Sequence, residues 1–299
     1  MRPWLRSLRI VAGAAGLLAL VAWPAHAGEG RSLMQDWVMP ESISTYGDRV
    51  DAIFNLILVI TGVTFLATEG ILLYESFAFI RQRGMKAQYI HGSHKLEMWW
   101  TIIPAVILFF LAISQTSLWS EVKMRDLSVG DAYHVRVMAK QFEWNFLYPG
   151  PDGKFDTADD VFSINELRIP VHQQVFLQMR SYDVIHSLYL PYVRFKQDVV
   201  PGMTVSGWVE ITKTTAMARL DRKDPNFEYE IACAELCGNQ HYSMRARLTI
   251  EEAPEIQRWQ AEFGKRKLAK PEIWKEWENS GGVIMYPETP EDEHAEHGK

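Results

Sequence analysis

Residues 227–250 read FEYEIACAELCGNQHYSMRARLTI, and this stretch joins two strand-like runs through a loop rich in metal-binding side chains. The loop holds both cysteines of the chain, Cys233 and Cys237. His241 and Met244 follow at intervals of four and three residues. Thiolate, imidazole and thioether groups are soft or borderline ligands that suit copper. This spacing predicts that one tight loop folds around a small metal centre.

A further candidate ligand, His186, lies upstream in the sequence Asp183-Val-Ile-His186-Ser187. A disulfide between the two cysteines would suit a periplasmic domain, but it would leave the histidine and the methionine of the loop unexplained. Zinc gains little from methionine. A mononuclear blue-copper site needs only one cysteine and would leave the other idle. Two coppers bridged by both thiolates would use every donor, with one histidine for each copper.

Short runs of alternating apolar and polar residues fill the region 131–250. Their apolar members are Val135 and Val137; Leu167, Ile169 and Val171; Val175, Leu177 and Met179; Phe227, Tyr229 and Ile231; and Ala246, Leu248 and Ile250. Period-two runs separated by Gly, Pro, Asn and Asp turns are typical of an all-β sandwich or barrel. The metal-binding loop would join the last two strands, so a rigid scaffold would present its ligands.

The N-terminus has the three parts of a secretory signal peptide. Three arginines lie within the first nine residues, residues 10–23 are apolar, and Ala25-His-Ala27 fits a cleavage site. The apolar run is too short to span a bilayer comfortably. We therefore expect a signal peptide at 1–27 and a periplasmic segment at 28–50.

A transmembrane helical hairpin is predicted at residues 51–120. Residues 99–119 carry no charge and have tryptophans at both ends, and their number matches one bilayer span. Residues 52–80 form the other apolar segment, which Glu69 and Glu75 interrupt.

The loop at 81–95 between these helices carries four Lys or Arg residues and no acidic residue. The positive-inside rule places such a loop in the cytoplasm and both termini in the periplasm. We therefore expect a multi-pass protein of the bacterial inner membrane whose metal-binding domain is periplasmic.

The remaining composition excludes several classes of protein. The net charge is −6, and no basic patch interleaved with aromatic residues is present, which disfavours nucleic-acid binding. The sequence has no Cys-x-x-Cys-His for attaching a c-type haem. Residues 251–299 are expected to form a helical or disordered acidic tail. Four aromatic residues of this tail are expected to anchor it against a neighbour: Trp259, Phe263, Trp274 and Trp277.

Three stretches of the sequence resemble subunit II of the haem–copper cytochrome c oxidases. The first is the run C-x-E-x-C-G-x-x-H-x-x-M at 233–244, preceded by D-V-x-H-S at 183–187. The second, at 97–104, is EMWWTIIP, which is similar to the family's entry into its second membrane helix. The third is the turn Val200-Pro201-Gly202. The resemblance covers roughly residues 48–250.

This resemblance implies a cupredoxin-like Greek-key barrel that holds a dinuclear copper (CuA) centre. The implied copper ligands are His186, Cys233, Cys237, His241, Met244 and the backbone carbonyl of Glu235. The Glu235 side chain would help to bind magnesium at the interface with the large subunit. The implied function is to accept electrons from a periplasmic cytochrome c or haem domain. These electrons would pass to haem in subunit I of a proton-pumping oxidase, which also contains subunit III.

One departure from the family concerns the entry of electrons. The family usually has Gln-Trp-Tyr-Trp where this chain has Gln141-Phe142-Glu143-Trp144. Phe142 therefore replaces the tryptophan that receives electrons in well-known relatives, so either Phe142 or Trp144 makes the contact or the donor docks differently. Oxidases that work beside alternative complex III resemble this variant, and a haem domain of such a supercomplex would then be the donor.

Glu97 and the segment Asp152–Asp160 are further candidate sites, for proton entry and for calcium binding. Glu97 opens the second membrane helix, where an ionisable group is costly, and it matches a glutamate at the mouth of a proton channel in bacterial relatives; an interfacial glutamate without such a role is the alternative. The segment Asp152–Asp160 holds four carboxylates and resembles a calcium loop, with a polar hairpin turn as the alternative.

Two further functions compete with that of an electron-entry subunit. A quinol-oxidase subunit of the same fold would lack the copper ligands that this sequence contains. A membrane-tethered copper carrier or assembly protein would bind copper without a catalytic partner, and would be purified without a haem-bearing subunit.

Overall fold

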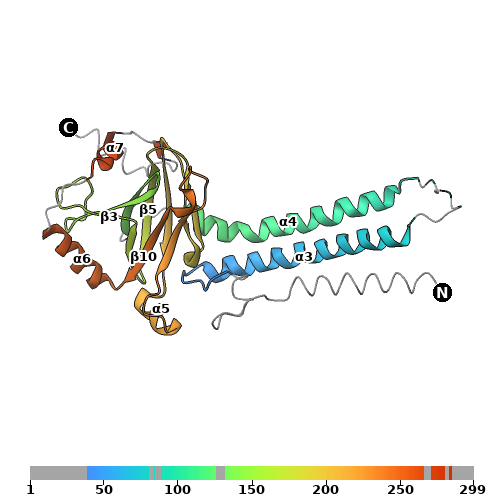
Figure 1. The fold of residues 1–299 in the computed structure, drawn as a ribbon, viewed down its shortest axis with the longest axis horizontal. Helices are drawn as coiled ribbons and strands as arrows, with labels where there is room; N and C mark the ends of the chain where they lie inside the picture. The colour runs from blue at the N-terminus through green and yellow to red at the C-terminus, as the bar shows by residue number, and fades with distance from the viewer. Residues whose placement is uncertain are drawn as a thin grey trace. The chain divides into compact units, whose positions relative to one another are not determined.

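The computed structural model describes residues 39–80, 84, 86, 89, 91–125, 132–265, 271–279 and 283–284. The expected signal peptide and the acidic C-terminal end lie outside these residues. The chain divides into two compact units. One contains residues 51–116, and the other contains 40–50 together with everything from Ser117 onward. Figure 1 shows the helices and strands of both units.

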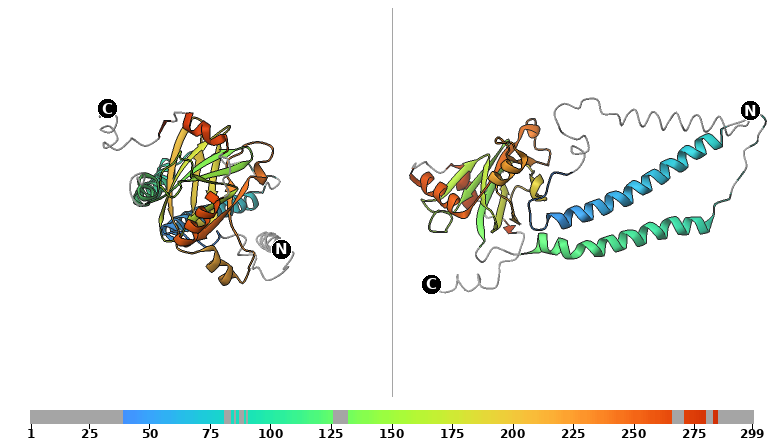
Figure 2. Two further views of the ribbon diagram at one scale, coloured as in Figure 1. Left: turned by 90° about the vertical axis from the view of Figure 1, so that its left-hand side faces the viewer. Right: turned by 90° about the horizontal axis from the view of Figure 1, so that it is seen from below.

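The first unit contains most of two long apolar helices, α3 (Gly47–Ala78) and α4 (His94–Met124), whose residues 47–50 and 117–124 belong to the second unit. Each is long and apolar enough to cross a membrane, and each runs unbroken in the right-hand view of Figure 2. The hydroxyl of Ser93 accepts a hydrogen bond from the backbone N–H of Leu96 at the start of α4, which satisfies one of the free donors of a helix N-terminus. The predicted pair of apolar helices is confirmed.

Within the described residues, the second unit, called the β unit from here on, contains eleven strands in two sheets. The larger sheet has the order β11-β8-β5-β1-β2-β3, and the smaller has the order β4-β10-β9-β6-β7. The strands are β1 (Tyr133–Lys140), β2 (Glu143–Tyr148), β3 (Val161–Ile164), β4 (Glu166–Pro170), β5 (Gln174–Ser181), β6 (His186–Leu190), β7 (Phe195–Val199), β8 (Met203–Glu210), β9 (Tyr229–Cys233), β10 (Arg245–Glu251) and β11 (Val283–Ile284). The predicted architecture, two helices followed by an all-β cupredoxin-like domain, is confirmed.

The core of the β unit is made by the alternating apolar residues that the sequence identified. In β1 and β5, which pair in parallel, Val135 and Val137 lie beside Leu177 and Met179, and all four are buried. In β10, Leu248 is buried in the same way. Successive residues of a strand point to opposite faces of the sheet, and alternate residues share one face. Apolar residues at a period of two therefore form one apolar face on each sheet, and these faces make the core.

The aromatic residues after Ile250 pack within their own chain, which corrects the expectation that they anchor against a neighbour. They belong to α6 (Ala253–Lys265) and α7 (Ile273–Asn279), which Figure 1 shows over different parts of the sheets. Trp274 and Trp277 are buried in a cluster with Met138 of β1 and Leu147 of β2. This cluster explains why β2 is buried along nearly its whole length.

Arginines of the larger sheet hold α7 in place. The guanidinium groups of Arg136 and Arg180 lie 5.3 and 4.5 Å from the ring centroid of Trp277. Arg180 also donates a hydrogen bond of 2.7 Å to the backbone oxygen of Trp277. Arginine over an indole face is a favourable cation–π pair, so these contacts tie the C-terminal segment to β1 and β5.

The last turns of α4 belong to the β unit and are fastened to it by three contacts. Glu121 accepts a hydrogen bond from Arg49 at 2.5 Å through its carboxylate, and its backbone oxygen accepts one from Trp208 Nε1 at 3.0 Å. Lys123 donates to the backbone oxygen of Lys196 at 3.1 Å. The end of the helix is therefore fixed to β7 and β8.

Candidate metal centre

Two strands and one loop position the candidate ligands. Cys233 ends β9, and Cys237 lies in the loop that leads to β10. His241 begins a short 3-10 helix, η2 (His241–Ser243), and Met244 follows it directly. His186 begins β6, which pairs with β9 so that Leu188 lies opposite Cys233. The antiparallel pairing of β9 and β10 closes the loop and brings its two ends together.

The sulfur atoms form the middle of the group. Cys233 Sγ and Cys237 Sγ are 3.8 Å apart, and both cysteines are free thiols. A disulfide needs an S–S distance of about 2.05 Å, so this arrangement is that of a ligand pair. A metal ion at about 2.3 Å from a thiolate sulfur can contact both of these sulfur atoms at once.

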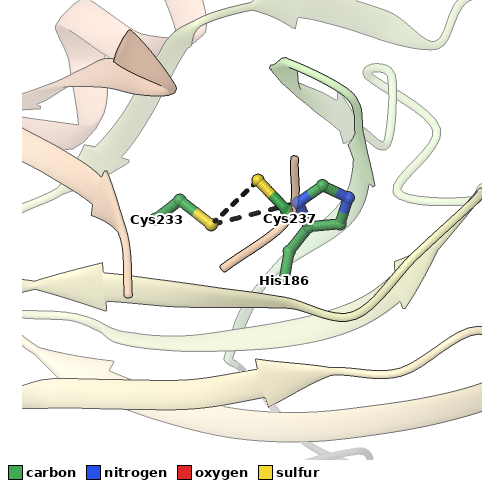
Figure 3. A group of neighbouring side chains, drawn as sticks. All are labelled: His186, Cys233 and Cys237. Carbon is green, nitrogen blue, oxygen red and sulfur yellow. Dashed lines mark hydrogen bonds between the residues drawn. The ribbon is translucent and has the colours of Figure 1, made fainter. Parts of the chain in front are cut away.

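Each thiol has a histidine of its own. His186 Nδ1 lies 3.9 Å from Cys233 Sγ, and His241 Nδ1 lies 3.6 Å from Cys237 Sγ. Figure 3 shows His186 converging with the two thiols. Within the described residues, His186, Cys233 and Cys237 are the one set of at least three His, Cys, Asp or Glu side chains whose ligand atoms lie within 4.8 Å of one another.

Two weaker donors complete the set. Met244 Sδ is 3.7 Å from Cys237 Sγ, and the backbone oxygen of Glu235 is 3.2 Å from Cys233 Sγ. The side chain of Glu235 is exposed, so only its carbonyl points to the thiols. The donor set contains two thiols, two imidazoles, a thioether and a carbonyl, which fits copper better than zinc or calcium.

Asp183 orients His186. Its carboxylate lies 2.8 Å from His186 Nε2 and accepts hydrogen bonds of 2.7 Å from the backbone N–H groups of Gln141 and Val184. A carboxylate on the far nitrogen of a ligating histidine fixes the tautomer and the direction of the ring. Nδ1 is therefore the nitrogen that faces the thiols.

The pKa values of these groups reflect this network. Burial lowers the pKa of His186, but its hydrogen bonds to Cys233 and Asp183 outweigh burial and raise that pKa above its usual value. Burial raises the pKa of Cys233, but hydrogen bonds from His186 and from backbone groups lower it overall. Burial and the neighbouring Cys233 raise the pKa of Cys237. The hydrogen bonds around Cys233 therefore favour its thiolate form.

The residues expected to receive electrons differ in exposure. The ring of Trp144 is completely buried, 6.1 Å from the ring of His186 and at 64° to it. Direct contact of Trp144 with a docked protein is incompatible with this burial. Phe142 is half-buried and lies against the loop, since a Cβ on Gly238 would come within 3.1 Å of its ring. Of these two aromatic residues, only Phe142 is accessible from the surface of the protein.

Gln141 and Asp183 extend the site beyond the ligands expected from the sequence. The side-chain amide of Gln141 donates to the backbone oxygen of Cys237, while its backbone N–H holds Asp183. For Asp183, the one feature of the sequence that pointed to the site is its position three residues before His186. Nothing local to residue 141 indicated that it would touch a loop 96 residues further along the chain.

The carboxylates of residues 152–160 find partners in and around their own loop. Asp156 forms an ion pair of 2.8 Å with Arg136, and its backbone N–H donates to Asp160. Thr157 donates to Asp159 at 2.6 Å, and Asp152 accepts from the N–H of Lys154. Such contacts are those of a polar turn, and calcium binding here stays an untested prediction.

Glu97 lies in the first turn of α4, as expected. Its carboxylate is 3.8 Å from His94 Nδ1, and both side chains are largely exposed.

Comparison with known proteins agrees with these observations. The family model for the transmembrane domain of cytochrome c oxidase subunit II matches residues 32–118, and the model for its periplasmic domain matches residues 152–251. The alternative cytochrome c oxidase subunit 2 of Bradyrhizobium diazoefficiens is 29% identical over 245 residues, which cover 75% of this chain and 82% of the relative. Cytochrome c oxidase subunit 2 of Thermostichus vulcanus is 26% identical over 297 residues, covering 79% and 84%.

Among solved structures, the periplasmic domain of subunit II of cytochrome oxidase from Bradyrhizobium japonicum is 25% identical. It aligns with 47% of this chain and 99% of that domain, with a TM-score of 0.37. The two family models follow one another along the sequence in the order of the two helices and the β unit. This chain belongs to the cytochrome c oxidase subunit II family.

Proposed function

We propose that this chain is the electron-entry subunit of a haem–copper cytochrome c oxidase. The observation that carries the proposal is the pair of free thiols, 3.8 Å apart, each with its own histidine. Two metal ions can share both thiolates, and each ion then has one imidazole. This symmetry is what a dinuclear copper centre requires, and no donor of the group is left over.

The residues of this chain would hold and tune such a centre. Cys233 and Cys237 would bridge the two copper ions, and His186 and His241 would each bind one of them. When bound, the copper pair supplies a site that accepts and releases one electron at a time. Asp183 would keep the ring of His186 in the ligating orientation, so that the coordination changes little between the two redox states.

The weaker donors and the surrounding core would set the environment of the centre. Met244 is buried, and the thioether is a weak ligand whose main effect is on the reduction potential. The thioether of Met244 would bind one copper ion, and the backbone carbonyl of Glu235 would bind the second. Cys237 and Met244 belong to the hydrophobic core cluster, which keeps water from their sulfur atoms. The exposed Glu235 side chain remains available for a magnesium ion shared with the large subunit.

Electron entry is assigned to the surface beside Phe142. The ring of Phe142 lies against Gly238, next to Cys237. Phe142 is half-buried, whereas Trp144, the other candidate, is completely buried. A phenyl ring is apolar and can pack against the edge of a haem of the donor. The donor is proposed to be a periplasmic cytochrome c or a haem domain, such as one held in a supercomplex with alternative complex III.

The membrane arrangement follows from the charges of the sequence. We assign the loop at 81–95 to the cytoplasm because of its four positive charges, and the β unit to the periplasm of a bacterial inner membrane. Residues 1–27 would be removed as a signal peptide. The haem-bearing subunit I and subunit III are the proposed partners, and Glu97 would lie at the cytoplasmic entrance of a proton path.

Rapid reduction of the purified complex tests this function. The full chain is isolated with its membrane partner, and reduction of the partner's haem by a reduced donor is followed by stopped-flow absorbance. The wild-type complex should reduce its haem far faster than a complex with Cys237→Ser. Equal rates would overturn the proposal. A chain that is purified with copper but without any haem-bearing partner would favour a copper carrier instead.

A further inference from the structure

Helix α5 (Thr215–Arg222) presents apolar side chains to the outside of the β unit, and Figure 1 shows this helix outside the two sheets. Met217 is 49% exposed and Leu220 is 77% exposed. They stand three residues apart and therefore lie on the same side of the helix. Because most large apolar side chains of the β unit are buried, two neighbouring exposed ones form a candidate interaction surface.

Hydrogen bonds near both ends of α5 hold the helix in place. Thr214 caps the helix by accepting a hydrogen bond of 3.1 Å from the backbone N–H of Met217. Thr215 accepts one of 2.9 Å from the backbone of β10. Towards the other end, the side chain of Arg219 donates to the backbone oxygen of Phe227 at 2.9 Å. An ordered helix therefore presents the exposed apolar pair.

The charge around this apolar pair is positive, although the chain as a whole is acidic. Residues 213–224 contain four Lys or Arg residues and two Asp residues, whereas the net charge of the chain is −6. Lys223 is exposed, and its ammonium group has no ion pair with the residues that the structure describes. Arg222 is also exposed and forms only a long ion pair, of 3.8 Å, with Glu41. Both cations can therefore attract a further anion.

Helix α5 is attached to the segment through which the chain enters the membrane. Backbone hydrogen bonds of 3.1 and 2.9 Å join residues 43–45 to residues 210–212, just before α5, and Lys213 pairs with Glu41 at 3.1 Å. Helix α3 begins at Gly47, and its uncharged stretch starts about 8 Å further along the helix. The first turn of α3 belongs to the β unit. Helix α5 is thus fixed on the side of the β unit from which α3 leaves.

A protein partner fits this surface less well than lipid does. A stable protein interface covers about 800 Å² on each partner, and two large apolar side chains provide only a small part of that area. A symmetric contact between two copies of the chain would also bring the basic residues of one α5 against those of the other. Phospholipid headgroups carry the phosphate that these residues attract, and they surround the point at which α3 enters the membrane.

We propose that α5 rests on the lipid surface, with Met217 and Leu220 among the headgroups and with Arg222 and Lys223 bound to the phosphate groups of anionic phospholipids. Apolar and basic side chains together on one exposed helix bind anionic membrane surfaces. This contact is a second attachment of the β unit, besides the ends of α3 and α4. It restricts rocking of the β unit and so keeps the candidate metal centre at a fixed height above the bilayer.

Photo-cross-linking from α5 tests this proposal. Benzoylphenylalanine replaces Leu220 in the full-length chain, and in a control chain it replaces Ile164 of β3, an apolar residue that is 49% exposed. Native membranes that contain either chain are irradiated, and the adducts on the purified chain are identified by mass spectrometry. Position 220 should give phospholipid adducts and position 164 far fewer. A protein adduct at 220, no adduct there, or equal phospholipid yields at the two positions would overturn the proposal.

The chemistry of the headgroup is tested in nanodiscs that contain phosphatidylglycerol and phosphatidylcholine in equal amounts. The cross-linker at position 220 should give more adducts with phosphatidylglycerol. Lys223→Gln should lower the ratio of the two adducts about fivefold, which is the effect of one basic residue near an anionic surface. Lys154→Gln removes an exposed lysine between β2 and β3 and should leave the ratio unchanged. Equal adducts with both lipids, or a ratio that Lys223→Gln does not change, would contradict the phosphate contact and leave the proposed function standing.

Discussion

The two units of this protein use their apolar residues in opposite ways. In α3 and α4 almost every large apolar side chain is exposed, as Leu66 is at 71%, and Leu118 is the one that is buried. In the β unit, Phe146, Leu167 and many other apolar residues have no exposed surface at all. The β unit therefore contains its own core, whereas most apolar side chains of the helices are left uncovered by the described residues. The candidate metal ligands all belong to the β unit, the one that contains its own core.

The largest expected effect is on the core of the β unit. Phe146→Ala should destabilise this unit by about 3–5 kcal/mol, because it removes a fully buried ring and leaves a cavity. Phe65→Ala removes the same ring from α3, where Phe65 is 61% exposed, but should change the free energy of unfolding of the β unit very little. Denaturant titration of the purified full-length chain gives both values. Equal losses would mean that the two units do not differ in the way described.

The next effect concerns the segment that covers the larger sheet. Trp277→Ala should cost about 1–3 kcal/mol, since it removes the ring that Arg136 and Arg180 share. Residues 271–284 should then become accessible to protease while β1–β10 remain folded. Leu220→Ala, at an exposed position of α5 (Thr215–Arg222), is the matched control. If Trp277→Ala leaves the protease pattern of this segment unchanged, the contacts with the two arginines do not hold it.

A smaller effect distinguishes a carboxylate held by several hydrogen bonds, Asp183, from an exposed one whose charge partner is Lys123, Asp198. Hydrogen bonds lower the pKa of Asp183 despite its burial, so its stabilising contribution is present above pH about 4 and is lost as the pH falls through its folded pKa. Asp183→Asn should therefore cost about 1–2 kcal/mol near neutral pH and less in acid. The exposed Asp198 provides the control, and Asp198→Asn should have almost no effect. Unfolding of the copper-free protein across a pH series measures the difference, and a pH-independent cost would contradict it.

The smallest effect is on electron entry. Phe142→Ala should slow reduction of the centre, because this half-buried ring lies against the loop beside Cys237 and still reaches the surface. Phe142→Trp should leave the rate nearly intact, since an indole offers the same kind of contact. Trp144→Phe should disturb folding more than transfer. Stopped-flow reduction by the donor gives the rates, and a Phe142→Ala variant as fast as wild type would move the docking site elsewhere.

Local patterns predicted what depends on local geometry. Alternation identified the strands around Val135, Leu177 and Leu248, because the period of two is a property of the extended backbone. The candidate metal ligands could be selected because Cys233, Cys237, His241 and Met244 lie in one loop and His186 stands in its own short motif. Two apolar segments of bilayer length identified the helices in the same way.

Local sequence patterns could not predict which distant segments contact one another. The aromatic character of Trp274 and Trp277 indicated that they would be buried, but it could not indicate which surface buries them. Trp144 and Phe142 stand two residues apart in the same segment, yet one is core and the other half-exposed. The role of Gln141 depends on the loop at 237–238, which only the pairing of the two sheets brings near it.

The central claim is that the two thiols of one loop bridge two copper ions, and the most direct test is copper analysis with electron paramagnetic resonance of the purified full-length protein. The account predicts two coppers per chain and a spectrum in which one unpaired electron is shared equally by both. Cys233→Ser and Cys237→Ser should each abolish that spectrum. A four-line spectrum from a single copper, bound zinc, or a mixed-valence signal that survives either substitution would contradict it.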